Sequence, residues 1–207
     1  MLRTAPWCEP DSARLPCLNF LSIVPEAVPV SIPRFLGQAS RPMLPFQSTT
    51  FAFLFTDIEG STGLWEHLAE AMARALDRHD AIVRDVIESH GGKVFKTVGD
   101  GFCSVFGDAL DAAEAAAAAQ RELQAEPWQA LDARIGMLRV RMAIHVGPAI
   151  ERAGDLYGPT LNQPARLLGA GHGGQILTSL VVQQMIRGRL GDGLELVDHG
   201  HHALRDL

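Results

Sequence analysis

From about residue 47 onward, hydrophobic and polar positions follow a regular order that predicts alternating strands and helices. Residues 51–56 form a short apolar run rich in phenylalanine, which is typical of a buried strand. Between residues 65 and 87, apolar side chains recur every three or four positions, as on one face of a helix. Ser61 or Thr62 is the expected N-terminal cap of this helix.

A hairpin and a second helix are expected next. Residues 93–98 and 101–106 flank the sequence Gly99-Asp100-Gly101, which favours two antiparallel strands joined by a tight turn. The alanine-rich segment 108–124 predicts a helix whose small side chains allow close packing on a sheet.

The last third of the chain repeats these signals at shorter lengths. Residues 138–146 alternate apolar and polar side chains, as in a half-buried strand that Gly147-Pro148 is expected to end. Short strands are expected at 175–178 and 194–197, with a helix at 179–187. This order predicts an α/β (α+β) fold, a ferredoxin-like βαββαβ core with extra C-terminal α/β elements.

The first 46 residues have a different composition, since they contain eight of the twelve prolines and show no sustained periodicity. Proline fixes φ and removes a backbone donor, so such a segment rarely builds regular structure. We therefore expect residues 1–46 to be an extension that is disordered or lies on the surface. Residues 47–207 are the expected folded domain.

The overall composition narrows the class of protein. The chain has 207 residues, 47% apolar and 20% charged, with a net charge of −6, which is typical of a globular domain and disfavours nucleic acid or anionic lipid as partners. No apolar run reaches the ~20 residues of a membrane-spanning helix, and the N-terminus lacks the pattern of a secretory signal. Three cysteines cannot form a disulfide framework, so a cytoplasmic location is expected.

Two aspartates are candidates for metal binding. Asp57 follows the first apolar strand, and Asp100 occupies the hairpin turn. If these strands are neighbours, the two carboxylates meet at one sheet edge, where their repulsion favours a hard cation such as Mg²⁺ or Mn²⁺. Gly60, Ser61 and Thr62 open the next helix, whose free amides attract phosphate. The plainer alternative is a helix cap and an ordinary turn residue.

Lys96 is unusual because regular alternation places it on the same strand face as Val94 and Val98. A lysine among apolar neighbours needs a partner if that face is buried. The alternative is an exposed lysine on an edge strand.

Asn162 and Arg166 are four residues apart and share a face if a helix runs there, with Pro164 in its first turn. Together they offer donors suited to a ribose oxygen and a phosphate. The alternative is that both are ordinary exposed polar residues.

Four stretches resemble, in order and spacing, the motifs of the class III nucleotidyl cyclases, the adenylate and guanylate cyclase catalytic domain: FLFTDIEGST, GGKVFKTVGDGF, VRMAIHVG and DLYGPTLNQPARL. The resemblance covers nearly all of residues 50–207, and its first motif is similar to that of bacterial members. It implies an adenylate cyclase that converts ATP to 3′,5′-cyclic AMP and pyrophosphate.

The resemblance also implies roles for the reacting end of the nucleotide. Asp57 and Asp100, with the carbonyl of Ile58, would hold two Mg²⁺ or Mn²⁺ ions. Asn162 would orient the ribose, and Arg166 would stabilise charge on the phosphorus under attack.

Base recognition is implied for Lys96 and Asp155. Lysine can only donate and aspartate can only accept, which suits the ring nitrogen and the exocyclic amine of adenine better than guanine. The family assembles each site from two subunits, so a homodimer with two shared sites is expected. The alternatives are a guanylate cyclase and a catalytically silent cyclase-like module that binds nucleotide. Pro164 and the absence of a last strand after HGHHALRDL depart from the family pattern.

Overall fold

The computed structural model describes residues 18–25, 49–191 and 193–202. The strands are β1 (Leu18–Pro25), β2 (Thr49–Ile58), β3 (Lys93–Val98), β4 (Gly101–Phe106), β5 (Val140–Arg152), β6 (Asp155–Tyr157), β7 (Ile176–Ser179) and β8 (Leu194–His202). The helices are α1 (Ser61–Ser89), α2 (Ala109–Ala125), α3 (Asn162–Ala170) and α4 (Leu180–Ile186), with 3₁₀ turns at Trp128–Ala130 and Pro159–Leu161. No helix of this described part is long and apolar enough to cross a membrane.

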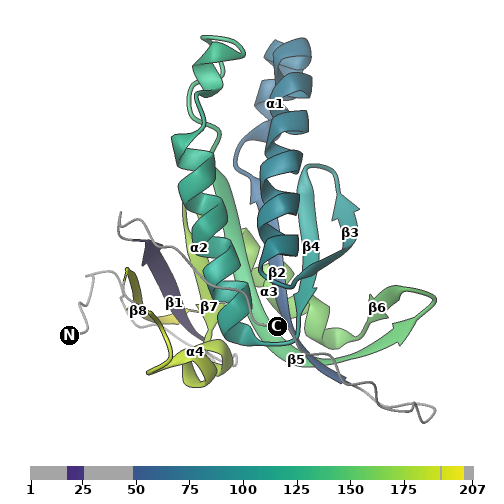
Figure 1. Ribbon diagram of the computed structural model, residues 1–207, viewed down its shortest axis with the longest axis vertical. Helices are drawn as coiled ribbons and strands as arrows, with labels where there is room; N and C mark the ends of the chain where they lie inside the picture. The colour runs from purple at the N-terminus through teal and green to yellow at the C-terminus, as the bar shows by residue number, and fades with distance from the viewer. Residues whose placement is uncertain (1–17, 26–48, 192, 203–207) are drawn as a thin grey trace.

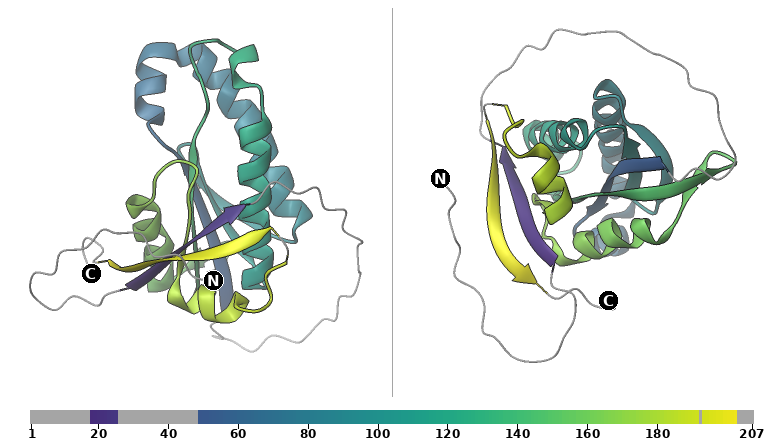
Figure 2. Two further views of the ribbon diagram at one scale, coloured as in Figure 1. Left: turned by 90° about the vertical axis from the view of Figure 1, so that its left-hand side faces the viewer. Right: turned by 90° about the horizontal axis from the view of Figure 1, so that it is seen from below.

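The strands lie in the order β3-β4-β2-β5-β7-β1-β8, and β6 pairs with β5 outside this path. Within it, β5-β2-β4-β3 is the order of a ferredoxin-like βαββαβ core, so the predicted fold class is confirmed. Helices α1 and α2 cover one face of the sheet, and α3 lies on the other (Figures 1 and 2).

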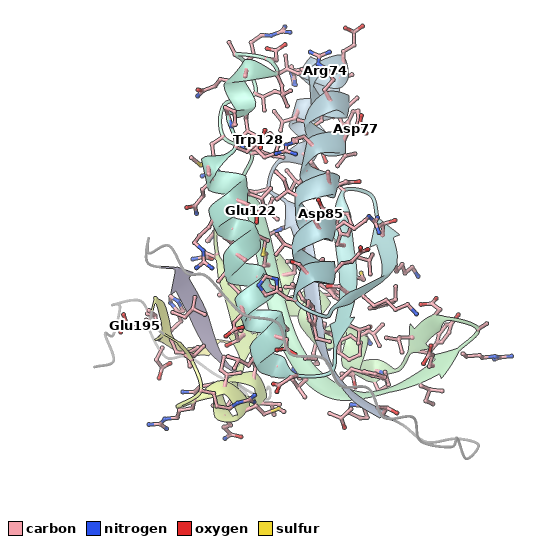
Figure 3. All side chains as sticks on the ribbon, in the orientation of Figure 1. Arg74, Asp77, Asp85, Glu122, Trp128 and Glu195 are labelled. Atoms are coloured by element: carbon pink, nitrogen blue, oxygen red, sulfur yellow. The ribbon has the colours of Figure 1, made fainter. Side chains whose placement is uncertain are left out.

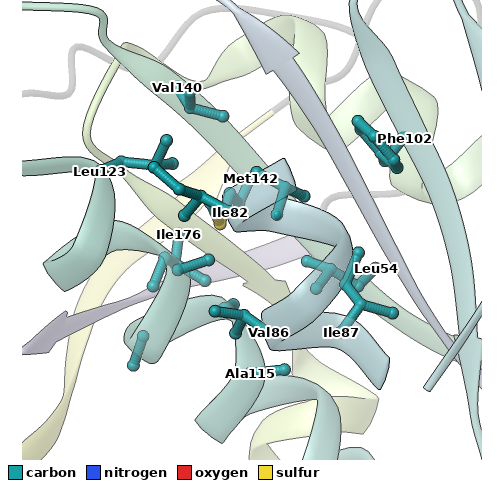
Figure 4. Packing of buried hydrophobic residues seen from close by; sticks show 14 of the residues in the cluster. Leu54, Ile82, Val86, Ile87, Phe102, Ala115, Leu123, Val140, Met142 and Ile176 are labelled. Carbon is teal, nitrogen blue, oxygen red and sulfur yellow. The ribbon is translucent and has the colours of Figure 1, made fainter. Parts of the chain in front are cut away.

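The main core lies between the sheet and the pair α1–α2 (Figure 4). Leu54 and Phe102 of the strands meet Ile87 of α1 and Ala115 of α2, and all four are almost fully buried. The acidic residues labelled on α1 and α2 in Figure 3, such as Asp85, are exposed on the outer side of these helices. A smaller cluster on the opposite face, beneath α3, is built from Phe53, Phe55, Ala149 and Leu156.

Strand β5 is longer than the sequence predicted, because Gly147-Pro148 does not end it. Residue Pro148 is paired with Thr50 of β2, and the strand continues to Arg152, where β6 pairs with it. Backbone partners on neighbouring strands therefore outweigh the local break that proline introduces.

The expectation for the N-terminal extension was wrong for residues 18–25, which form β1. This strand pairs antiparallel with both β7 and β8, so β8 joins the sheet through β1 and not through β7 (Figure 2). The periodicity of so short a segment is weak, and its pairing depends on edges that distant parts of the chain supply. Residues 1–17 and 26–46 lie outside the described part, so the expectation for them stays a prediction.

Candidate active site

The first predicted carboxylate, Asp57, is half-buried at the end of β2 and lies directly across from Arg141 of β5. The Nε and Nη2 atoms of Arg141 donate to the same oxygen, Oδ2 of Asp57, at 2.8 and 2.6 Å. The guanidinium therefore compensates the negative charge of Asp57. Sequence reasoning placed Arg141 only among the polar positions of an alternating strand, and nothing in that pattern indicates its partner.

The second carboxylate, Asp100, is held beside β2 by its hairpin. Phe102 N donates to Thr56 Oγ1 at 3.1 Å, and a Cβ atom at Gly101 would lie only 2.6 Å from the carbonyl oxygen of Thr56. This close approach places Asp100 next to the residue that precedes Asp57. The β2–β4 pairing therefore brings Asp100 to the same end of the sheet as Asp57.

The donor set at this edge fits a divalent cation. Oδ2 of Asp100 is buried and has no hydrogen-bond partner among the described residues, although a buried carboxylate oxygen normally has one. Oxygen donors of this kind suit Mg²⁺ or Mn²⁺. The described residues contain no group of three or more His, Cys, Asp or Glu that could hold a metal ion. Asp57 and Asp100 would therefore share a cation with other oxygens, such as the Ile58 carbonyl.

The start of α1 differs in one respect from expectation. Gly60, in the left-handed region with φ 73°, takes the capping position, and no side chain caps the helix, so the predicted role of Ser61 or Thr62 as a cap was wrong. Helix α1 is also interrupted at Leu68, where φ is −140°. The first amides of the helix thus have no side-chain acceptor, which suits an anionic ligand beside Asp57.

Glu59 follows the candidate metal ligands Asp57 and Ile58, here called the metal loop, and precedes the start of α1. It was not among the predicted site residues, and three interactions restrain it. Its backbone N–H donates to the carbonyl of Arg139 at 2.9 Å, and its Oε1 accepts from Gly173 N at 3.0 Å. Its Oε2 lies 2.9 Å from Nη2 of Arg139. The Gly173 amide, together with Arg139, His172 and Arg141, lowers the pKa of Glu59 despite partial burial.

Lys96 does not lie where regular alternation predicted. The register of β3 shifts by one residue, so that Val94 faces Ser104 but Lys96 faces Cys103. Because residues 103 and 104 point to opposite faces, Lys96 and Val94 do too, and the prediction of a shared face was wrong for this pair. The alternative of an exposed lysine on an edge strand describes its position, since β3 is the last strand on its side.

Asp155 and Lys96 come together at Cys103. Burial raises the pKa of the Cys103 thiol to about 11, and the nearby charge of Lys96 lowers it while that of Asp155 raises it further. The turn that brings Asp155 back along β5 has positive φ at Ala153 (54°) and at Gly154 (83°). The two residues predicted to read a base are thus on one face, around a half-buried thiol.

Asn162 and Arg166 lie one turn apart on α3, as predicted, with Asn162 exposed and Arg166 half-buried. Pro164 is within the first turn and is buried with Leu167 against the sheet, so it anchors the helix without breaking it. Arg166 forms no hydrogen bond or ion pair with any described side chain, which leaves its guanidinium free for a ligand.

The 3₁₀ turn before α3 sets the position of this helix. Thr160 Oγ1 donates to the carbonyl of Pro148 at 2.6 Å. A Cβ atom at Gly147 would lie 2.5 Å from the methyl group of Thr160, so only glycine allows this contact. The glycine that was expected to end β5 therefore serves to dock α3.

A cavity of about 140 Å³ opens on the α3 side of the sheet, next to the Lys96–Asp155 pair. The cavity is lined mostly by apolar residues, together with one lysine and one glutamate. The lining residues are Phe51, Lys93, Phe95, Val105, Glu151, Gly154 and Leu156. Lys96 and Asp155 follow Phe95 and Gly154 directly in the chain, so they border this cavity without lining it.

Comparison with known proteins identifies the family of the chain. Residues 45–205 match the family described as the adenylate and guanylate cyclase catalytic domain. An uncharacterized protein of Mycobacterium tuberculosis is 37% identical over 161 residues, covering 76% of this chain and 52% of that protein. The adenylate cyclase of Mycosarcoma maydis is 35% identical over 161 residues, covering 68% of this chain and 6% of the relative.

A solved structure of an adenylate cyclase from Trypanosoma brucei has a TM-score of 0.70 and 25% identity, covering 76% of this chain and 85% of that chain. A solved structure of an adenylate/guanylate cyclase/hydrolase from Silicibacter pomeroyi shares the fold, with a TM-score of 0.68. It is 24% identical, and the match covers 78% of this chain and 92% of that chain. The chain spans about half the length of the mycobacterial relative. It spans a much smaller share of the fungal adenylate cyclase. On these sequence and structural grounds, the chain belongs to the adenylate and guanylate cyclase catalytic domain family.

Proposed function

We propose that this cyclase domain converts ATP to 3′,5′-cyclic AMP and pyrophosphate, at two sites shared by the subunits of a homodimer. The observation that carries the choice of ATP is the convergence of Lys96 and Asp155 on Cys103. The other parts of the site suit any nucleoside triphosphate. The choice between ATP and GTP therefore depends on the residues proposed to bind the base, Lys96 and Asp155, which we call the base pocket.

The base pocket supports adenine on chemical grounds. The ammonium of Lys96 can donate to a ring nitrogen, and the carboxylate of Asp155 can accept from the exocyclic amine. Guanine presents a carbonyl oxygen and a ring N–H on this edge, so neither charge would find its partner. A site built for hydrogen bonds rejects a mismatched ligand by about 10⁴-fold.

At the other end of the nucleotide, Asp57 and Asp100 would hold the divalent cations. Cations bound there would neutralise charge on the triphosphate and lower the pKa of the ribose 3′-hydroxyl. Arg141 keeps Asp57 paired until a cation takes its place. The amides at Gly60, Ser61 and Thr62, at the start of α1 where no side chain caps the helix, would bind phosphate oxygens.

The remaining step belongs to α3. Asn162 would orient the ribose so that its 3′-oxygen faces the α-phosphorus in line with the departing pyrophosphate. Arg166, which has no protein partner in the described chain, would stabilise the charge that spreads over the phosphoryl oxygens. No protein nucleophile is required.

The homodimer is proposed because the family divides these groups between subunits, with Asp57 and Asp100 from one chain and the residues on the α3 side from the other. Exposed apolar side chains support a partner surface. Val98 beside the Asp100 turn is 60% exposed, and Ile150 and Tyr157, which face each other across β5 and β6, are 47% and 52% exposed.

The decisive assay supplies the purified full chain with Mn²⁺ and either ATP or GTP, and quantifies the cyclic nucleotide formed. We expect cyclic AMP from ATP and little product from GTP. Asp57→Ala should abolish the activity, whereas Asp85→Ala, at an exposed position on α1, should retain it. Preferential use of GTP would reject the base assignment. Nucleotide binding without turnover would instead favour the silent module.

A further inference from the structure

Asp57 of β2 faces Arg141 of β5, and Glu59, just after β2, lies beside Arg139, just before β5, but the two acidic residues are held differently. Among the described residues, the guanidinium of Arg141 is the one group that donates to the side chain of Asp57, and this flexible side chain can turn away. Glu59, two residues later, has two hydrogen bonds to backbone groups, through its N–H to the Arg139 carbonyl and through Oε1 from Gly173 N. Its Oε2 forms an ion pair with Arg139 but accepts no hydrogen bond among the described residues. Asp57 can therefore exchange its partner for a cation, while Glu59 has fixed partners.

The contact between Glu59 and Gly173 joins the metal loop to the segment that leads into β7. Gly173 N donates to Oε1 of Glu59 at 3.0 Å. A Cβ atom at Gly173 would lie 2.5 Å from Cβ of Arg139 and 2.8 Å from Oε2 of Glu59. The glutamate, the arginine and the glycine are thus in close contact, and no larger residue fits at position 173.

The backbone of Glu59 is restrained at the same time. Its N–H donates to the carbonyl of Arg139 at 2.9 Å, which extends the β2–β5 pairing one step beyond Ile58. Directly after it, Gly60 turns the chain into the left-handed region to begin α1. Asp57 and Ile58 are paired with Arg141 and Val140, so the chain gains freedom only after them, at Glu59 and Gly60.

We infer that Glu59 is a positioning residue for the metal loop: its side-chain contact with Gly173 keeps Asp57 and the Ile58 carbonyl aimed at the cation position when Arg141 leaves. The inference rests on the proposed function, since it assigns a role in that same site. In this inference Glu59 acts through Asp57 and Ile58 and is not itself a ligand of the cation. Residues that orient metal ligands typically change metal affinity or activity by about 10- to 100-fold when replaced.

The test compares Glu59→Ala with Glu59→Gln in the full chain. Calorimetry measures the affinity for Mn²⁺ in the presence of a non-cyclising ATP analogue, and cyclase assays give the half-saturating Mn²⁺ concentration and kcat separately. Glu59→Ala should weaken Mn²⁺ binding about 10-fold or more. Glu59→Gln keeps an oxygen that accepts from Gly173 N, so its affinity for Mn²⁺ should stay within about 3-fold of the wild-type affinity. Glu70→Ala, at an exposed position of α1, should not change it.

The inference would be overturned if Glu59→Gln and Glu59→Ala lost equal amounts of Mn²⁺ affinity. An unchanged Mn²⁺ affinity in Glu59→Ala would overturn it as well. If Glu59→Ala does not fold, Glu59→Asp replaces it, because its shorter side chain keeps the charge but cannot reach Gly173. Binding is measured independently of turnover. A wild-type protein that binds Mn²⁺ and the analogue but forms no cyclic nucleotide would therefore reject the proposed function alone.

Discussion

Arg141 and Asp57 face each other across β5 and β2, and two nitrogens of the guanidinium share one carboxylate oxygen at 2.8 and 2.6 Å. The two side chains are 30% and 27% exposed, so the pair is partly screened by water and contributes about 1 kcal/mol or less. Its consequence is functional, because a cation that binds Oδ2 of Asp57 competes with Arg141 for that oxygen.

Replacing Arg141 with methionine should therefore separate apo stability from cation binding. In EDTA we expect the melting temperature to fall by about 2–4 °C, since Asp57 loses its partner beside Asp100. The rise in melting temperature on adding Mn²⁺ should exceed that of wild type, because no guanidinium competes. Thermal unfolding with and without Mn²⁺ measures both. Arg134→Met, which removes an exposed local pair with Asp132, is the control, and an unchanged Mn²⁺ effect in Arg141→Met would refute the competition.

Gly101→Ala should displace the hairpin that carries Asp100. The added Cβ would meet the carbonyl oxygen of Thr56 at 2.6 Å, and neither backbone segment can yield easily. We expect a loss of about 1–3 kcal/mol in unfolding free energy and a larger relative loss of cyclase activity. Denaturant unfolding and the ATP assay test this. Gly107→Ala meets nothing within 4 Å and should change neither quantity.

Cys103 should react slowly with alkylating reagents near neutral pH. Its pKa of about 11 leaves roughly a hundredfold less thiolate at pH 8 than an ordinary exposed cysteine has. The rate should climb as the pH rises toward 11, and ATP should slow it further if the base lies against Lys96 and Asp155. Peptide-level mass spectrometry after iodoacetamide treatment follows this residue separately from the other two cysteines. Fast labelling at pH 7 would contradict the burial of the thiol.

Mixing Asp57→Ala with Arg166→Ala should restore activity if sites are shared. In a heterodimer, one site receives Asp57 from one chain and Arg166 from the other, while the second site lacks both. Random mixing then yields about a quarter of wild-type activity per chain. The cyclase activity of each variant alone should be about 10³-fold lower than that of the wild type. Heterodimers isolated with two affinity tags that remain inactive would argue for sites within single chains.

Deleting residues 1–42 should destabilise the domain, because β1 is removed and β8 then loses its partner in the sheet. We expect the melting temperature to fall by more than about 5 °C and aggregation to increase through the newly exposed strand edge. The matched control deletes residues 1–17 and keeps β1. Identical melting curves for both deletions would show that β1 contributes no stability.

The elements themselves were predictable because their signals are local. A short stretch of sequence is enough to predict each element, as for the apolar run of β2, the glycine-flanked turn at Asp100 and the alanine-rich α2. The resemblance to cyclase motifs then implied roles for the aspartates and for the residues of α3.

Which side chains meet depends on how distant segments pack in the folded chain. Arg141 bonds a carboxylate 84 positions away in the chain, and Lys96 joins Cys103 only because β3 shifts its register by one residue. Glu59 finds Gly173 across 114 positions, and β1 enters the sheet between two strands from the far end of the chain. Periodicity records which face of an element is apolar. The identity of each partner depends on register and packing between distant segments, which no local window contains.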